Sequence, residues 1–158
     1  MSTINININK YEDVMEKYDN NKLSSELAYF IYNQYMSLPL RKGIELNIET
    51  NFEITEEQEG IISDMIHRYF GLQVQKSIYN FRYKTKYQIF LFLIGVLLIA
   101  ISNLKVFADF STIHEILLII GWVAVWELFY DGFYVEYKEN IKRKRYKKLS
   151  EVKINFIK

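Results

Sequence analysis

The chain has 158 residues, of which 50% are hydrophobic and 16% aromatic, and a single proline, a composition that excludes general disorder. Its formal net charge of +1 excludes a strong overall attraction to nucleic acid, so nucleic acid is not an expected partner. Because there is no cysteine, disulfides, thiolate nucleophiles and thiolate metal sites are excluded as well. The length accommodates one modest domain, or a small domain with membrane-spanning segments.

The first 40 residues predict one strand followed by two helices. Residues 4–9, INININ, alternate between apolar and polar side chains, which is typical of a strand. Asn9 and Glu12 have the spacing of a capping pair at the start of a short helix. A second helix is expected over residues 22–37, ending before Pro39.

The next 40 residues predict a strand–helix–strand unit. Residues 43–54 alternate cleanly, and Thr55 and Gln58 form another capping pair before a helix that we expect to end at Gly71. The following stretch, residues 72–83, alternates aromatic and polar side chains toward its end and is interpreted as a strand. The alternative is a helix over residues 74–86, continuous with the apolar run that follows.

Two long apolar runs indicate a membrane hairpin, with spans at about residues 87–104 and 113–133. About 20 helical residues cross a hydrocarbon core roughly 30 Å thick, and each run supplies nearly that number. The first run is free of charged residues, whereas the second carries His114, Glu115 and Glu127. The competing interpretation is a buried core hairpin of a soluble protein, which would need more surrounding amphipathic helices than this chain supplies.

Basic residues predict the orientation of the hairpin. They cluster before the first span and after the second, while the connecting loop holds only Lys105, balanced by Asp109. Under the positive-inside rule, both termini are cytoplasmic and the loop lies outside. We therefore expect a multi-pass protein of the cell (inner) membrane of a bacterial type.

Glu127 is an ionisable residue near the end of the second apolar run, about 21 Å along the helix axis from Ile113. Aromatic residues surround it in the sequence, which is typical of a membrane interface. One hypothesis is an interfacial carboxylate that accepts a hydrogen bond from Gln88 at the start of the first span. The other is a ring of Glu127 side chains that lines the pore of an oligomer.

The C-terminal region predicts a basic juxtamembrane helix, kinked at Gly132, and a short last strand at residues 152–158. A strand this short is unstable alone, so we expect it to join the sheet formed before the first span. The helix is a candidate surface for anionic lipid or for a ligand, and a nucleotide could stack on its tyrosines. Its candidate residues are Lys138, Lys142, Arg143, Lys144, Arg145, Lys147 and Lys148.

Motifs that carry chemistry are absent from the sequence. There is no glycine-rich phosphate loop, and His67 with Asp64 supplies only two of the ligands that a metal site needs. We therefore expect no catalytic residues, no metal site, no cofactor and no enzymatic activity.

The predicted fold is a membrane α-helical hairpin of two transmembrane helices, inserted in a small cytoplasmic α/β domain that consists of the strand–helix–strand unit and the C-terminal strand. Residues 1–84 form the cytoplasmic domain, residues 85–134 the hairpin, and residues 135–158 the basic helix and last strand. The functional hypothesis is a non-enzymatic membrane protein whose cytoplasmic domain binds a protein or nucleotide partner while the hairpin anchors it as a homo-oligomer. The alternative is a small pore-forming or membrane-perturbing effector, of the toxin or anti-phage type, gated by that domain.

Overall fold

The computed structural model describes residues 2–104 and 111–157. The described chain is mostly helical, with two long apolar helices and a small strand-containing region. It divides into two compact units. Met1–Lys76 together with Lys142–Lys158 form the α/β unit, and Ser77–Ile141 form the helical unit.

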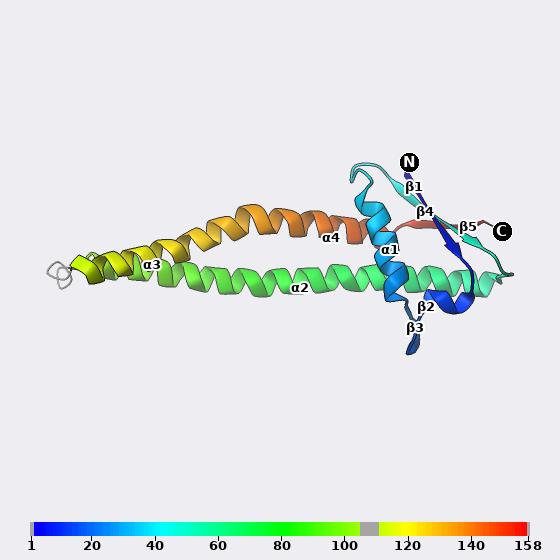
Figure 1. Ribbon diagram of the computed structural model, residues 1–158, viewed down its shortest axis with the longest axis horizontal. Helices are drawn as coiled ribbons and strands as arrows, with labels where there is room; N and C mark the ends of the chain where they lie inside the picture. The colour runs from blue at the N-terminus through cyan, green and yellow to red at the C-terminus, as the bar shows by residue number, and fades with distance from the viewer. Residues whose placement is uncertain (1, 105–110, 158) are drawn as a thin grey trace. The chain divides into compact units, whose positions relative to one another are not determined.

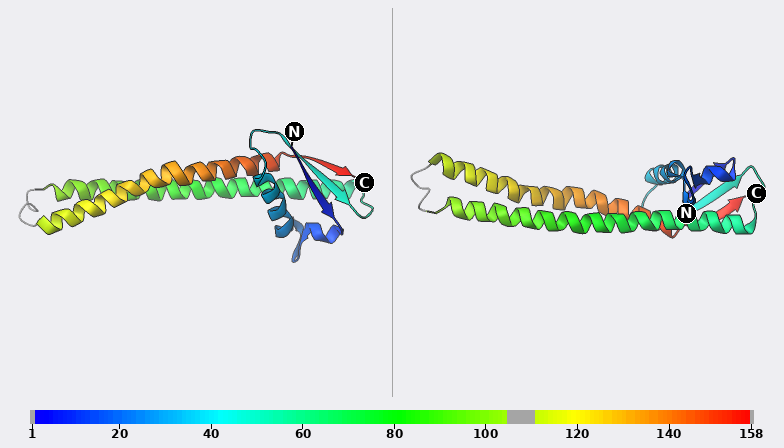
Figure 2. Two further views of the ribbon diagram at one scale, coloured as in Figure 1. Left: turned by 45° about the horizontal axis from the view of Figure 1, so that its top comes forward. Right: turned by 90° about the horizontal axis from the view of Figure 1, so that it is seen from below.

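The α/β unit is built on a three-stranded parallel sheet in the order β1-β4-β5. The strands are β1 (Ser2–Ile8), β4 (Ile44–Thr50) and β5 (Lys153–Ile157). Figure 2 shows β4 between the other two. The last strand therefore pairs with a strand that precedes the apolar helices, which confirms the predicted addition of the C-terminal residues to this sheet.

One face of the sheet packs against helices because its apolar residues fall at every second position. Helix α1 (Ser25–Met36) and the first turns of α2 (Glu56–Ser102) cover that face. The most buried side chains of this core include Ile4, Ile6, Ile31, Tyr35, Leu46, Ile48, Ile62, Ile66, Phe70 and Leu149. The opposite face is polar, with Asn5, Asn47 and Asn155 in register across the three strands.

The segment after β1 differs from the predicted helix. It forms a single 3₁₀ turn (Tyr11–Val14) followed by a small antiparallel pair, β2 (Met15–Glu16) and β3 (Asp19–Leu23). The helix prediction was wrong because a turn at residues 17–18 brings the chain back on itself, so Met15 and Glu16 pair with β3 instead of continuing a helix.

Helix α2 is the main correction to the sequence-based prediction. It runs without interruption from Glu56 to Ser102, so the predicted strand at residues 72–83 and the predicted helix end at Gly71 are wrong (Figure 1). The continuous helix held as the alternative is the observed structure. A single glycine costs a helix only about 1 kcal/mol, and α2 contains no proline. The position beside β4 that a further strand would occupy is taken by β5.

The start of α2 follows its predicted capping pair. The Gln58 backbone N–H donates to the Thr55 hydroxyl at 3.3 Å, and the Thr55 N–H donates to the Gln58 side-chain oxygen at 3.1 Å. These two bonds satisfy amide groups that have no partner within a helix's first turn.

The helical unit consists of the second part of α2, helix α3 (Ser111–Tyr130), a π-helix η3 (Asp131–Val135) and the start of α4 (Glu136–Ser150). The views of Figure 2 show α3 alongside α2. Both apolar helices are long and apolar enough to cross a membrane by length and composition. Only 11% of the most apolar stretch of each helix is buried.

Candidate functional site

A polar cluster joins the two helices of the helical unit. Lys84 and Gln88 stand one turn apart on α2, and both contact Asp131, the first residue of the π-helix. The Lys84 Nζ lies 2.9 Å from the Asp131 Oδ2, and the Gln88 side-chain amide donates to the same oxygen at 2.7 Å. The Asp131 side chain is 12% exposed, so two donors hold an almost buried charge.

The side chain of Gln88 has a different partner from the predicted one, Glu127. Gln88 donates to Asp131, and the Glu127 side chain is exposed. Asp131 is one turn beyond Glu127 and faces α2, so it reaches the amide that Glu127 was expected to use. The sequence signal that could have found this cluster is the i, i+4 spacing of Lys84 and Gln88 opposite a carboxylate.

The π-helix coincides with the predicted irregularity at Gly132. The Glu136 backbone N–H donates to the Asp131 carbonyl, the i to i+5 pattern of a π turn. Gly132 has nothing within 4 Å of the position that a β-carbon would occupy. The irregularity is therefore a widened turn beginning at the residue that binds Lys84 and Gln88.

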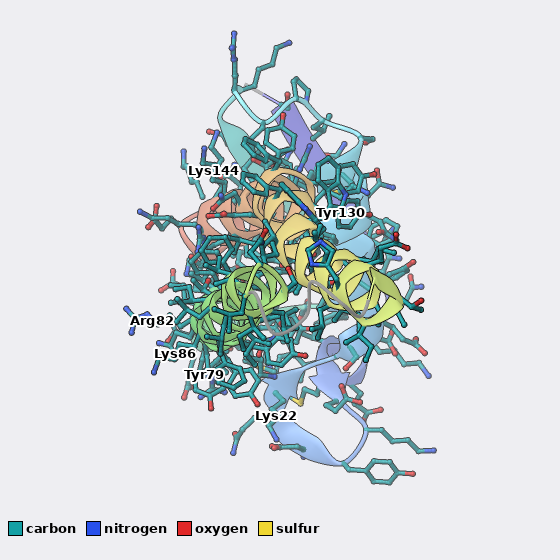
Figure 3. All side chains as sticks on the ribbon, turned by 90° about the vertical axis from the view of Figure 1, so that its left-hand side faces the viewer. Lys22, Tyr79, Arg82, Lys86, Tyr130 and Lys144 are labelled. Atoms are coloured by element: carbon teal, nitrogen blue, oxygen red, sulfur yellow. The ribbon has the colours of Figure 1, made fainter. Side chains whose placement is uncertain are left out.

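A band of exposed aromatic and cationic side chains surrounds this cluster. On α2, exposed Tyr and basic residues recur at helical spacing, and Figure 3 shows Tyr79, Arg82 and Lys86 extending from the same side of that helix. Across the π-helix, Lys138 lies 4.4 Å from the ring centroid of Tyr134. The exposed members of this aromatic–basic band are Tyr79, Arg82, Tyr83, Lys86, Tyr87, Tyr130, Phe133, Tyr134, Tyr137 and Lys138.

The predicted basic surface on α4 is smaller than the sequence indicated, because Arg145 is only 8% exposed. Its guanidinium donates to the backbone carbonyls of Tyr35 and Leu38 at the end of α1, and its Cζ lies 4.8 Å from the centre of the Tyr35 ring. A cation at a helix C-terminus satisfies carbonyls that have no partner within the helix. Arg145 is therefore a structural residue of the α/β unit rather than part of a lipid or ligand surface.

Lys148 also acts inside the α/β unit, donating to the carbonyls of Leu40 at 2.6 Å and Lys42 at 3.1 Å. Lys142 lies 6.0 Å from the ring of Tyr146, and that ring packs on Tyr32 at 4.9 Å rather than standing free to stack on a base. Arg143 is half-buried. The exposed residues of the predicted set are Lys138, Lys144 and Lys147.

His67 connects α2 to the C-terminal strand. Its Nε2 lies 2.9 Å from the Val152 carbonyl, to which a protonated Nε2 donates. The His67 ring is therefore directed at the backbone next to β5. Within residues 2–104 and 111–157, no three metal-ligating side chains gather into a group that could hold a metal ion.

No protein-family model, no curated protein and no solved structure matches this chain.

Proposed function

We propose that the protein is a non-enzymatic integral membrane protein, in which the helical unit crosses the cell (inner) membrane as a two-helix hairpin and the α/β unit binds a cytoplasmic partner or ligand. The observation that carries the proposal is the apolar surface of α2 and α3. Large apolar side chains are exposed along both helices: Phe90, Leu93, Leu97, Ile116, Ile119, Ile120, Trp122, Val123 and Trp126. A soluble monomer rarely exposes so extended an apolar surface, whereas a lipid bilayer covers it.

The aromatic–basic band supports a proposal for where the headgroup region of the membrane lies along the hairpin. Tyrosine, lysine and arginine concentrate where a helix crosses the headgroup region. From Gln88 to Ser102, α2 extends about 21 Å, and the 20 residues of α3 extend about 30 Å. These lengths approach a hydrocarbon core of roughly 30 Å when the Lys84–Asp131 pair lies at the interface.

The orientation rests on the distribution of charge. Arg82, Lys86 and Lys138 belong to the band, and exposed Lys144 and Lys147 follow on α4. Each basic residue near an anionic membrane surface contributes roughly 1 kcal/mol of attraction. Both termini would then be cytoplasmic, with anionic lipid headgroups as a direct partner.

Cysteine labelling tests the topology, because the native chain has no cysteine. The single variants Ser2→Cys, Ala108→Cys and Glu151→Cys are treated in intact spheroplasts with a membrane-impermeant maleimide. Ala108→Cys should be labelled from outside, and the other two variants only after the membrane is opened. Labelling of all three variants in intact spheroplasts, or recovery of the protein in the soluble fraction without detergent, would contradict the proposal.

The oligomeric state is part of the same proposal. Two helices with large apolar faces leave much surface to lipid, so packing of several copies into a homo-oligomer is expected. Chemical cross-linking in native membranes, followed by sizing in mild detergent, should give discrete multimers. A single monomeric species under both conditions would exclude this part and leave the anchoring role intact.

Glu127 favours a second candidate function, a small pore-forming or membrane-perturbing effector. Its carboxylate is exposed on α3 beside Trp126, which is 69% exposed. An ionisable side chain on an otherwise apolar span is costly in lipid and is stabilised when several copies surround a water-filled path. Expression of the wild type should then depolarise cells, and Glu127→Gln should alter the conductance without loss of assembly. Glu115→Gln, at the start of α3, is the matched control, and equal effects of both variants would argue for the anchor alone.

A further inference from the structure

The α/β unit has a surface groove of about 440 Å³ between β3 and the first half of α2. All of its lining residues belong to that unit. Its size is within the range of small-molecule sites, about 300–1,000 Å³. The groove is separate from the predicted basic surface on α4, which contributes no residue to it.

Three cationic side chains line the groove. Arg68 and Lys76 lie about two turns apart on α2, on the same side of the helix, and Lys22 comes from β3. The only carboxylate among the lining residues is Asp19, whose Oδ2 lies 2.8 Å from the Lys22 Nζ. One cation is thus neutralised locally, and the groove keeps an excess of positive charge.

The guanidinium of Arg68 is held in place by the backbone of the β3 segment. One of its terminal nitrogens donates to the Asn21 carbonyl. Arginine has five N–H donors in a rigid planar fork, so this bond leaves others for a ligand. An arginine fixed in this way loses less conformational entropy on binding an anion than a freely rotating one.

The groove also has an apolar wall. Tyr69 is half-buried and packs edge-on against Phe70, with ring centroids 5.3 Å apart, which fixes the orientation of its ring. Leu72 is 48% exposed and lies between Arg68 and Lys76 along the helix. A purely inorganic anion would leave this wall exposed, whereas a ligand with a planar or apolar part would cover it.

We propose that this groove binds a phosphate ester that carries a planar or apolar group, with Arg68 and Lys76 beside the phosphate and Tyr69 and Leu72 against the remainder. Arginine and lysine around one anion are the side chains that recognise phosphate by charge-assisted hydrogen bonds. This inference rests on the proposed function in one respect, because it names the ligand that the α/β unit is proposed to bind. The phosphate ester could be a free nucleotide or a lipid headgroup, and the two sources require separate arms of the test.

The test uses the full chain in nanodiscs, with two kinds of probe. In the first arm, ATP, GTP and inorganic phosphate are titrated against protein in zwitterionic nanodiscs, with the heat of binding as the readout. In the second arm, phosphatidic acid replaces part of the zwitterionic lipid, and the readout is protection of the Gln73→Cys thiol from a water-soluble maleimide. Gln73 lines the groove, so an occupied groove should slow the labelling of that position.

Two variants and one control are compared in both arms. The variants are Lys76→Gln and Arg68→Gln, each of which removes a cation of the groove. The control is Arg41→Gln, because it removes an exposed cation of the α/β unit outside the groove. Lys76→Gln keeps the Arg68–Asn21 bond, so its effect cannot be attributed to loosening of β3.

Loss of one charge-assisted bond should weaken binding about tenfold in Lys76→Gln and at least as much in Arg68→Gln, with little change in Arg41→Gln. Binding in the first arm supports a free phosphate ester, and protection in the second arm alone supports a headgroup. Absence of both, or an equal effect of the Arg41 control, would overturn the inference. Membrane insertion measured by cysteine labelling would be unaffected by that failure, which separates it from failure of the anchor.

Discussion

Gly95 and Gly121 bring the backbones of α2 and α3 into direct contact. A β-carbon on Gly95 would lie 2.8 Å from the Gly121 carbonyl oxygen and 2.9 Å from the Ala124 β-carbon. A β-carbon on Gly121 would lie 2.9 Å from the Gly95 carbonyl oxygen and 2.6 Å from a side-chain carbon of Ile99. Since backbone atoms cannot yield as a flexible side chain does, only glycine fits at both positions.

The first prediction concerns this contact. Gly121→Val should separate the two helices and destabilise the helical unit by about 1–3 kcal/mol, the usual range for overpacking. Thermal unfolding in detergent micelles, followed by circular dichroism, measures the effect. Gly71→Ala is the matched control, because nothing lies within 4 Å of that added carbon, and alanine should stabilise α2 by up to about 1 kcal/mol. Equal melting curves for the two variants would contradict the close contact.

The second prediction concerns the Lys84–Asp131 ion pair. Because Lys84 is 47% exposed, solvent screens the pair, and Asp131→Asn should cost no more than about 1 kcal/mol. The single variants Lys84→Asp and Asp131→Lys should each lower the free energy of unfolding. The double variant, in which the two charges are exchanged, should recover part of that loss. A double-mutant cycle on unfolding measures the coupling, and a coupling energy of zero would mean that the pair contributes nothing to the hairpin.

The third prediction separates Arg145 from its basic neighbours. Arg145→Leu removes a buried donor to the Tyr35 and Leu38 carbonyls, so we expect a loss of about 2–4 kcal/mol in the free energy of unfolding. Lys144→Gln, an exposed neighbour on the same helix, should stay within about 0.5 kcal/mol of the wild type. Denaturant titration of the full chain in detergent provides both values. Similar losses in the two variants would show that Arg145 acts as surface charge.

The fourth prediction is that the stability of the protein depends on pH through Glu16, in the segment before α1. The side-chain hydroxyl of Ser25 and then its backbone N–H donate to Glu16, at 2.8 and 3.0 Å, and they lower the pKa of that carboxyl below its ordinary value of 4.5. The stability that this adds is present above pH 4.5 and is lost as the pH falls through the lowered pKa.

Glu16→Gln should therefore reduce the stability near neutral pH and flatten its decline in acid, as measured by melting temperatures between about pH 3 and pH 7. Glu53→Gln, an exposed substitution outside this segment, serves as the control. A wild-type acid profile that Glu16→Gln leaves unchanged would exclude the contribution of the Glu16–Ser25 bonds.

Local pattern in the sequence was enough for several elements. The alternation in residues 4–9 and 43–54 predicted β1 and β4, and the Thr55–Gln58 pair predicted where α2 begins. The C-terminal strand was placed in the right sheet because a strand this short needs partners. The two long apolar helices followed from length and composition alone.

Other features depended on contacts that no local pattern shows. Residues 72–83 fit both periodicities, and the pairing of β5 with β4 left no place for a further strand beside it. Arg145 lies within a run of lysine and arginine, which suggested a surface position. It nevertheless lies on the core-facing row of α4 and binds the end of α1.

The apolar helices, the alternating strands and the basic segment all follow from the order of neighbouring side chains along the chain. The choice of which polar groups meet depends on folding in three dimensions, because Gln88 and Asp131 are 43 residues apart, and Arg145 and Tyr35 are 110 residues apart. The Gln88–Asp131 pair depends on how α2 packs against α3 at Gly95 and Gly121, and the Arg145–Tyr35 pair depends on how α4 packs against α1.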